Sequence, residues 1–323
     1  MNTFTRRGAL RTIAAGAASL ALPAFAAWPE RPIKIIVSFP AGGASDIVAR
    51  VLGEQLARKL GQPVVIDNRP GAGGSVGGLA VTQAAPDGYT LLLSNSTPIS
   101  IGPFALEKQP YDPVEGFTHI ALIGTAPCVV MANPQTTLKT MADIEKQAKA
   151  SGRLDFGSGG PASIGHIYGE LMRKEMNAQL VHVPYRGGAP MTTDLIAGII
   201  PMGIDVLTAF VPYFKAGQIR PVAVTSKQRS SLVPDVPTVV EAGYPGLVLE
   251  NFFGLSGPAK MPADVVSRLN GATGEVLQDA DFKKKMAELG IATQPTSAAG
   301  FAAFVREQVA QLAPVVKGSG VKL

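Results

Sequence analysis

The chain is poor in cysteine, aromatic residues and charge. Of its 323 residues only one is cysteine, and aromatic and charged residues make up 6% and 16%. The single cysteine, Cys128, excludes an internal disulfide, so a chain of this length depends on its apolar core for stability. Because Cys128 lies in the apolar stretch "APCVVMA", we expect a buried, unreactive thiol. No basic tract interleaved with aromatic residues is present, which argues against a nucleic acid or an anionic membrane surface as partner.

The motifs of common catalytic, metal and nucleotide sites are also missing. A Walker A loop needs a lysine where "PAGGASD" has Asp46, and the dinucleotide fingerprint needs a final glycine where "GAGGSVGG" has Val76. "PASIG" has Pro161 in place of the first glycine of a nucleophile elbow. No Cys pair or His-Glu-x-x-His motif occurs. We therefore predict no cofactor, no metal and no enzymatic activity, with a hydrolase that uses Ser163 and His166 as the alternative.

The first 26 residues predict an export signal. "TRRGALR" precedes an apolar, alanine-rich run that ends in the small-x-small triplet Ala24-Phe25-Ala26. Arg6-Arg7 leaves both the Sec and the twin-arginine routes open. The run is shorter than a membrane span and is interrupted by Pro23. We predict cleavage of residues 1–26, a periplasmic location, no membrane insertion afterwards and a mature net charge near +2 instead of +5.

Short β-rich runs alternate with longer amphipathic runs, which is typical of parallel α/β units. The first block contains the strand candidates "IKIIVSF", "PVVIDNR" and "YTLLLSNS". A second block repeats the pattern with "RLDFGSGG", "LVHVPYR" and "PMGIDV". We predict an α/β fold.

Two segments predict crossings between the blocks. "FTHIALIGTAPCVVMANP" is long for one strand and carries Pro127 in its middle, and "IRPVAVTS" at 219–226 is the candidate return. The C-terminal helical runs would then pack back on the first block. We predict a discontinuous first domain, 27–126 plus 227–323, around a second domain, 127–226.

"FPAGGASD", residues 39–46, links a predicted strand to a predicted helix. The first turn of a helix leaves backbone N–H groups unpaired and partly positive, so this turn suits a carboxylate. Gly42 and Gly43 would allow close approach, and Asp46 is the expected N-cap. A purely structural turn is the alternative.

"FGSGGPASIGH" repeats this arrangement in the second block. Ser158 and Ser163 can donate hydrogen bonds, Gly159 and Gly160 expose amides, and His166 falls one turn into the helix. His166 either faces a bound anion or serves the structure alone. Turns at the carboxyl ends of strands are where open α/β sheets bind ligands, so the two turns would face each other across a cleft.

The chain resembles the Bug family, the periplasmic receptors of tripartite tricarboxylate transporters. The resemblance covers nearly the whole mature chain and rests on "WPERPIKIIVSFPAGGASDIVAR", "VVIDNRPGAGGSVGGLAV", "PDGYTLLLSN", "LDFGSGGPASIGHIYGELM", "VHVPYRGGAPMTTDLIAG", "IRPVAVTSKQRSSLVPDVPTVVEAGYPG" and "FFGLSGPAKMP". It implies a two-lobed, type II periplasmic-binding-protein (Venus-flytrap) fold. It further implies that the fold closes by a hinge on a small carboxylated solute, which in some systems is delivered to a two-subunit membrane transporter.

The resemblance also implies which residues contact the ligand. They are Phe39, Ala41, Gly42, Gly43, Ala44, Ser45, Asp46, Ser94, Asn95, Thr97, Ser158, Gly160, Ser163, His166, Tyr185, Gly187 and Asp205. Asp205 would meet the ammonium of an amino-acid ligand or cap a loop. Where relatives have polar residues this chain has Pro201 and Val206, so the ligand class stays open among dicarboxylates, tricarboxylates, amino acids and aromatic carboxylates. A sensory receptor for a membrane kinase is a further alternative.

Overall fold

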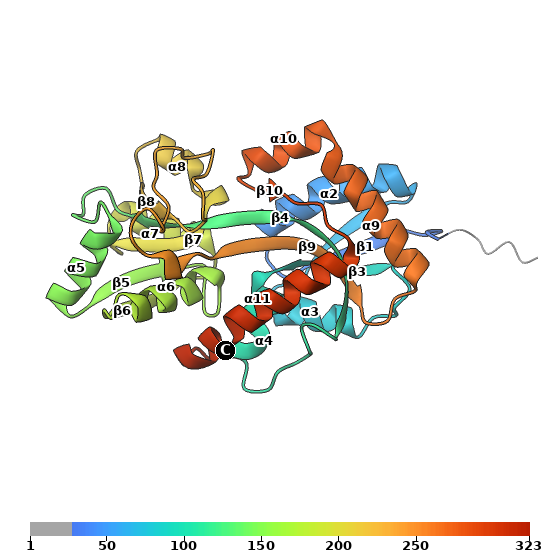
Figure 1. Cartoon of the computed structure of the whole chain (residues 1–323), viewed down its shortest axis with the longest axis horizontal. Coiled ribbons are helices and arrows are strands. Elements are labelled where there is room, and N and C mark those ends of the chain that lie inside the picture. The colour runs from blue at the N-terminus through green and yellow to red at the C-terminus, as the bar shows by residue number, and fades with distance from the viewer. Residues whose placement is uncertain (1–27) are drawn as a thin grey trace, which may run out of the picture.

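The computed structural model describes residues 28–323, so the predicted export signal lies outside it (Figure 1). Ten strands form one mixed sheet in the order β2-β1-β3-β9-β4-β7-β5-β6, and β8 and β10 both pair with β4. The strands are β1 Ile33–Val37, β2 Val64–Asn68, β3 Thr90–Asn95, β4 Phe117–Ala132, β5 Leu154–Ser158, β6 Leu180–Pro184, β7 Met202–Val206, β8 Arg220–Val224, β9 Glu250–Pro258 and β10 Ala292–Thr293.

Helices cover the sheet on both faces. They are α2 Ala44–Leu60, α3 Ser75–Thr82, α4 Gly102–Ala105, α5 Met141–Ser151, α6 Ile164–Glu175, α7 Gly188–Ala197, α8 Val211–Lys215, α9 Ala263–Gln278, α10 Ala280–Glu288 and α11 Ala298–Ser319. Four short helical turns are η1 Ala72–Gly74, η2 Thr97–Ile101, η3 Leu207–Ala209 and η4 Pro245–Leu247. This is the predicted α/β fold.

The first strand set consists of the parallel strands β1, β2 and β3. Ile35 and Val37 pack against α2 and α9 on one face, and Ile36 packs with α3 and α11 on the other. Burial of both faces explains why β1 is a continuous apolar run without polar alternation. Parallel pairing also places the carboxyl ends of all three strands at one edge.

The second strand set, β5, β6 and β7, is also parallel. Phe156 of β5 lies in a core with α5 and α6. The opposite face is covered by α7 and η3, with Met191 and Leu207 buried there. The two sets therefore repeat one α/β architecture.

The strands β4 and β9 join the two sets. β4 pairs with β9 from Phe117 to Pro127, then with β7 from Cys128 to Ala132 and with β8 from Val129 to Ala132. Figure 1 shows β4 and β9 running together across the middle of the molecule. The predicted crossing in "FTHIALIGTAPCVVMANP" is confirmed, and Cys128 is buried as expected.

The predicted return crossing at 219–226 is wrong. β8 pairs only with the second-set end of β4, and the strand that runs back is β9. The reason is that the connecting segment stays with the second set, where Val239, Leu247 and Leu249 are buried beside α6. The domain boundaries at 126/127 and 226/227 stay a prediction.

The C-terminal helix α11 contacts both sets. Phe301 and Val305 pack under the first set, as predicted, but Leu312 and Val316 belong to the core of the second. The helix therefore spans the junction beside β4 and β9 (Figure 1). Within residues 28–323, no helix combines the length and the apolar character needed to cross a bilayer.

Candidate functional site

The turn between β1 and α2 differs from its prediction in one respect: Asp46 is not the N-cap. Gly43 holds that position with extended backbone (φ −82°, ψ 171°), and α2 begins at Ala44. Asp46 lies in the first turn, is only 3% exposed, and accepts a hydrogen bond from the Gly42 N–H at 2.9 Å. A carboxylate at this position can reach back past a glycine N-cap that has no side chain of its own.

The Asp46 carboxylate ties the turn to two neighbouring elements. It accepts hydrogen bonds from Nε of Arg50 at 2.9 Å and from Nδ2 of Asn68 at 3.0 Å. The same Asn68 amide donates to the Phe39 carbonyl at 3.0 Å. Burial alone would raise the pKa of Asp46, but the hydrogen bonds from Arg50, Gly42 and Asn68 outweigh it and lower the pKa. Asp46 is therefore an ionised anchor whose charge is balanced inside the protein.

This anchoring leaves main-chain donors at the start of α2. The first helical bond in α2 runs from the Ile47 N–H to the Gly43 carbonyl at 3.0 Å, so the amides of Gly43, Ala44 and Ser45 precede the helical ladder. Gly42 and Gly43 are exposed. An oxyanion that approaches the start of this helix from the side of Gly42 and Gly43 therefore meets no side chain of these two residues.

The turn after β3 is joined to the same place. Asn95 donates from Nδ2 to the Ser45 hydroxyl at 3.0 Å, and its Oδ1 accepts from the Thr97 N–H at 3.0 Å. Ser94 is not brought to this group. It is fully buried and its hydroxyl lies 3.0 Å from that of Ser256, so we leave it out of the proposed contacts.

The turn between β5 and α6 is held by neutral groups. Ser163 is the N-cap of α6 and accepts from the His166 N–H at 3.3 Å. Its hydroxyl donates to Ser158 Oγ at 3.0 Å, and Ser158 Oγ also lies 2.7 Å from Nε2 of His182. Gly160 adopts a φ of 136°, which permits the sharp turn before the helix.

His182 is a candidate site residue that the sequence analysis missed. Its ring stacks on that of His166 with centroids 3.6 Å apart and planes 13° apart. The only signal in the sequence is its place in the strand candidate "LVHVPYR", shortly before the turn; its contacts depend on the parallel register in which Phe156 pairs with His182. We assign it a positioning role because it contacts both Ser158 and His166.

Burial favours the neutral form of both imidazoles. Burial lowers the pKa of His166, and burial together with the neighbouring His166 lowers that of His182 to about 3. Nδ1 of His166 accepts from the Ala162 N–H at 3.1 Å, which leaves its proton on Nε2. This ring can therefore donate one hydrogen bond from Nε2 without carrying a charge.

The geometry argues against the hydrolase alternative. The Ser163 hydroxyl is engaged by Ser158 and by the backbone of His166, whose Nδ1 is taken up by Ala162. The closer serine–histidine pair, Ser158 with His182, has its serine fully buried. No carboxylate of the described chain orients either ring by a hydrogen bond, so the arrangement lacks a working triad.

Asp205 is the next-to-last residue of β7, beside these turns. Its Oδ1 accepts from the Val206 N–H at 2.8 Å, which supports the loop-capping reading, while Oδ2 faces Gly159 and Gly188. Burial raises the pKa of Asp205 to about 6. Among residues 28–323 no cation forms an ion pair with it. A carboxylate in this condition can accept a ligand's ammonium or hydroxyl group.

Tyr185 and Gly187 shape the site through their backbone. The Tyr185 hydroxyl donates to Asp194 of α7 at 2.8 Å, so its side chain is held on that helix. The Gly187 N–H donates to the Gly159 carbonyl at 3.1 Å. These bonds fix the turn after β6 against the turn after β5.

The predicted residues therefore form two groups that meet at the junction. Ile101 of η2 is buried with Ile164 of α6, and a Cβ on Gly73 would lie 3.6 Å from Ala162. Val206 packs on the second-set core and also on the first-set core that Phe39 contacts. The carboxyl ends of both strand sets thus converge, and no group of three metal-ligating side chains occurs in the described part of the chain.

Comparison with known proteins identifies relatives along the whole chain. Residues 48–321 match the family "Tripartite tricarboxylate transporter family receptor". The chain is similar to Protein BugT of Bordetella pertussis, with 34% identity over 99% of both chains.

Solved structures show the same fold. A Rhodopseudomonas palustris protein with adipate has a TM-score of 0.85 and 30% identity and covers 91% of this chain and 99% of its own. MatC of Rhodopseudomonas palustris with bound malate has 0.82 and 28%, covering 90% and 100%. The periplasmic binding protein BugD has 0.80 and 31%, covering 91% and 99%. The fold is thus the expected two-lobed binding-protein fold, and the chain is a receptor rather than an enzyme.

Proposed function

The chain belongs to the tripartite tricarboxylate transporter receptor family, and we propose that it captures a small carboxylate in the periplasm for delivery to a two-subunit membrane transporter. The observation that carries the proposal is the start of α2. There the amides of Gly43, Ala44 and Ser45 precede the helical ladder, and the nearby Asp46 carboxylate is neutralised by Arg50. Main-chain N–H donors suit a group with a single negative charge, and the Asp46 carboxylate does not repel it because its own charge is paired with Arg50.

The second lobe would supply the opposing contacts. His166 would donate from Nε2, and Ser163 would hold the turn beside it through its hydrogen bonds to Ser158 and His166. Thr97, in the turn after β3, would add a hydroxyl group from the first lobe. Closure would be a hinge motion about β4 and β9, the two strands that join the lobes. Adipate and malate, bound by two relatives, are both dicarboxylates, which makes a dicarboxylate the first class to test.

Calorimetric titration with adipate, malate, citrate, aspartate and benzoate tests the proposal. At a hundredfold excess over Kd a true ligand stabilises the folded state by about 2.7 kcal/mol, which a thermal shift would also detect. A folded sample that binds none of these compounds would contradict the proposal. Osmotic-shock fractionation would test export. We expect the shortened chain in the periplasmic fraction, and finding the uncleaved chain in the cytoplasm would contradict export.

Asp205 offers a test of selectivity within the carboxylates. Its half-buried carboxylate, with Oδ2 facing the turns, would favour aspartate over malate, because aspartate carries an ammonium where malate carries a hydroxyl. We expect Asp205→Asn to lower the aspartate-to-malate affinity ratio about tenfold, equivalent to 1.4 kcal/mol. An unchanged ratio would assign Asp205 to loop capping alone.

A further inference from the structure

A pocket lies at the junction, apart from the residues proposed to bind the carboxylate. Its volume is about 460 Å³, which is within the range of small-molecule sites. It is lined by Thr125 and Glu250 on the two long strands, by residues 226–231 after β8, and by Ala287 with residues 290–292. None of the residues assigned above to carboxylate binding lines it.

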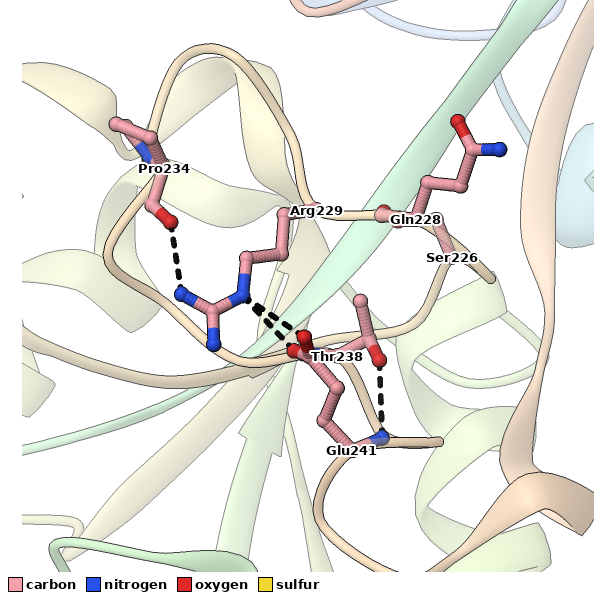
Figure 2. Close-up of polar contacts among 6 residues, drawn as sticks. All are labelled: Ser226, Gln228, Arg229, Pro234, Thr238 and Glu241. Atoms are coloured by element: carbon pink, nitrogen blue, oxygen red, sulfur yellow. Dashed lines mark hydrogen bonds and ion pairs between the residues drawn. The ribbon is translucent and has the colours of Figure 1, made fainter.

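One wall of this pocket is held rigidly (Figure 2). Nε of Arg229 donates to both carboxylate oxygens of Glu241 at 3.1 and 2.9 Å, and its guanidinium also donates to the Pro234 carbonyl at 3.0 Å. Glu241 in turn exchanges hydrogen bonds with Thr238 through backbone and side chain. The Ser226 hydroxyl closes the turn on the Gln228 carbonyl at 2.6 Å. A wall fixed in this way loses little entropy when a ligand binds.

The same wall carries polar groups that make no side-chain hydrogen bond to the described residues. Glu241 neutralises Arg229, so Lys227 is left as the cation without an ion pair on this wall. The amide of Gln228 points away from the Arg229–Glu241 pair in Figure 2, and the Ser231 hydroxyl joins these donors. Together they form a set suited to a carboxylate.

The opposite wall carries a carboxylate. Glu250 is half-buried and receives only a long hydrogen bond, 3.4 Å from the Thr125 hydroxyl. Burial raises the pKa of Glu250, although the charge of Lys227 partly offsets this. An ammonium group beside Glu250 would favour its ionised form and gain a charge-assisted hydrogen bond.

Contacts between the lobes border the pocket. The Thr208 hydroxyl of η3 donates to the Leu289 carbonyl at the end of α10. A Cβ on Gly290 would lie 2.6 Å from Leu232, so the two walls touch here. An occupant would therefore contact segments from both lobes beside the strands that join them.

We propose that this pocket binds a small zwitterion, with its ammonium on Glu250 and its carboxylate on Lys227, Gln228 and Ser231. The site would be independent of the proposed carboxylate site. Because it bridges the lobes, its occupant would bias their relative orientation.

Amide chemical shifts of the ¹⁵N-labelled folded protein test this directly. Glycine, β-alanine and 4-aminobutyrate serve as probes, since the distance between ammonium and carboxylate increases along the series. We expect saturable shifts for residues 227–231 and 290–292, with one member of the series binding best. Glu250→Gln and Lys227→Met should each weaken that binding at least tenfold, whereas Glu307→Gln, on the exposed side of α11, should not change it.

Three results would overturn the proposal. One is the absence of shifts with all three probes, and another is unchanged affinity in Glu250→Gln. The third is a set of shifts confined to Gly43–Ser45, which would place the zwitterion in the carboxylate site and leave the function proposed above intact. Lys227 is exposed, so its variant should fold even if the Glu250 variant does not.

Discussion

The turns that lead into α2 and α6 are stabilised by different kinds of side chain. Each helix follows a parallel strand, and the N-terminus of each helix lies at the junction of the lobes. At α2 the N-cap is a glycine, and the turn is held by an ionised carboxylate with Arg50 and Asn68. At α6 the N-cap is Ser163, and the turn is held by neutral hydroxyls and two stacked imidazoles.

We infer from this difference that the two turns have different roles in ligand binding. At the α2 turn the proposed donors are main-chain amides, which would bind an anion without selecting its shape. The α6 turn presents side chains, whose positions depend on one another. We therefore expect affinity for a carboxylate to come mainly from the first turn and selectivity among carboxylates from the second.

The largest effect should come from Asp46→Ala. It leaves Arg50 and the Gly42 amide without their partner, and losing hydrogen bonds to a buried charge should cost on the order of 3 kcal/mol in the free energy of unfolding. Denaturant unfolding and calorimetry would measure stability and binding, and both should fall.

Asp143→Ala is the matched control, since Asp143 occupies the equivalent position in the first turn of α5, remote from the site. It should lower stability less and leave binding unchanged. If Asp46→Ala binds normally, the anchor is not needed for the ligand amides.

The next effect concerns pH and His182. The unfolded imidazole titrates near 6.5, whereas the pKa of His182 in the fold is about 3. The unfolded state therefore binds more protons below pH 6.5, so the stability from neutral His182 is present above that pH and is lost as pH falls toward 3.

His182→Asn should make the decline of unfolding free energy between pH 7 and 4 shallower. It should not abolish the decline, because burial also lowers the pKa of His119 to about 4. We expect a loss of about 2 kcal/mol at pH 7 from the missing contact with Ser158. An unaltered pH profile would show that the stacked pair does not hold the second turn.

Ser163→Ala should have a smaller effect. Loss of an N-cap costs about 1 kcal/mol, and the Ser158 hydroxyl also loses a donor. Ser297→Ala removes the N-cap of α11, which accepts from the Gly300 N–H at 3.1 Å, and provides a matched comparison away from the site. The two variants should lose similar stability, but only Ser163→Ala should change the ranking of ligands. If Ser163→Ala binds the ligands in the same order of affinity as the unmodified protein, Ser163 does not contribute to selectivity.

The smallest effect on folding should come from Gly43→Ala. The backbone there suits any residue, and an added Cβ would meet only the Pro40 carbonyl, at 3.7 Å. Stability should change by less than about 0.5 kcal/mol. The methyl group would nevertheless obstruct the amides, so the affinity for a carboxylate should fall about tenfold.

Gly61→Ala gives the opposite pattern and serves as its control. Gly61 ends α2 with φ 71°, so this variant should lose about 1 kcal/mol of stability and keep its affinity. If Gly43→Ala binds as tightly as the unmodified protein, the ligand does not approach the amides of α2.

Much of this fold could be predicted from local sequence. The apolar run of β1 and the apolar stripe of α2 that ends before Gly61 could each be recognised from neighbouring residues alone. The return strand β9 was missed because the order of strands across a sheet depends on distant pairings. The long segment before β9 resembles a loop, and only its burial against α6 keeps it with the second lobe.

The site was predictable to a similar extent. Glycine-rich turns after strands identified the starts of both helices, but the sequence did not show which residue is the N-cap of α2. With Gly43 and Asp46 both available, the backbone at Gly43 decided the N-cap and turned Asp46 into an anchor. His182 was missed for a different reason, since its contacts come from the register between β5 and β6.

The measurement that tests the account most directly is a titration of the ¹⁵N-labelled protein with a dicarboxylate such as adipate or malate. We predict that the amide protons of Gly43, Ala44 and Ser45 move downfield, as expected for hydrogen bonds to a carboxylate. Resonances of Ser163 and His166 should change with the same Kd as the lobes close. Binding that leaves the amides of Gly43–Ser45 unmoved would contradict the central claim that the start of α2 holds the carboxylate.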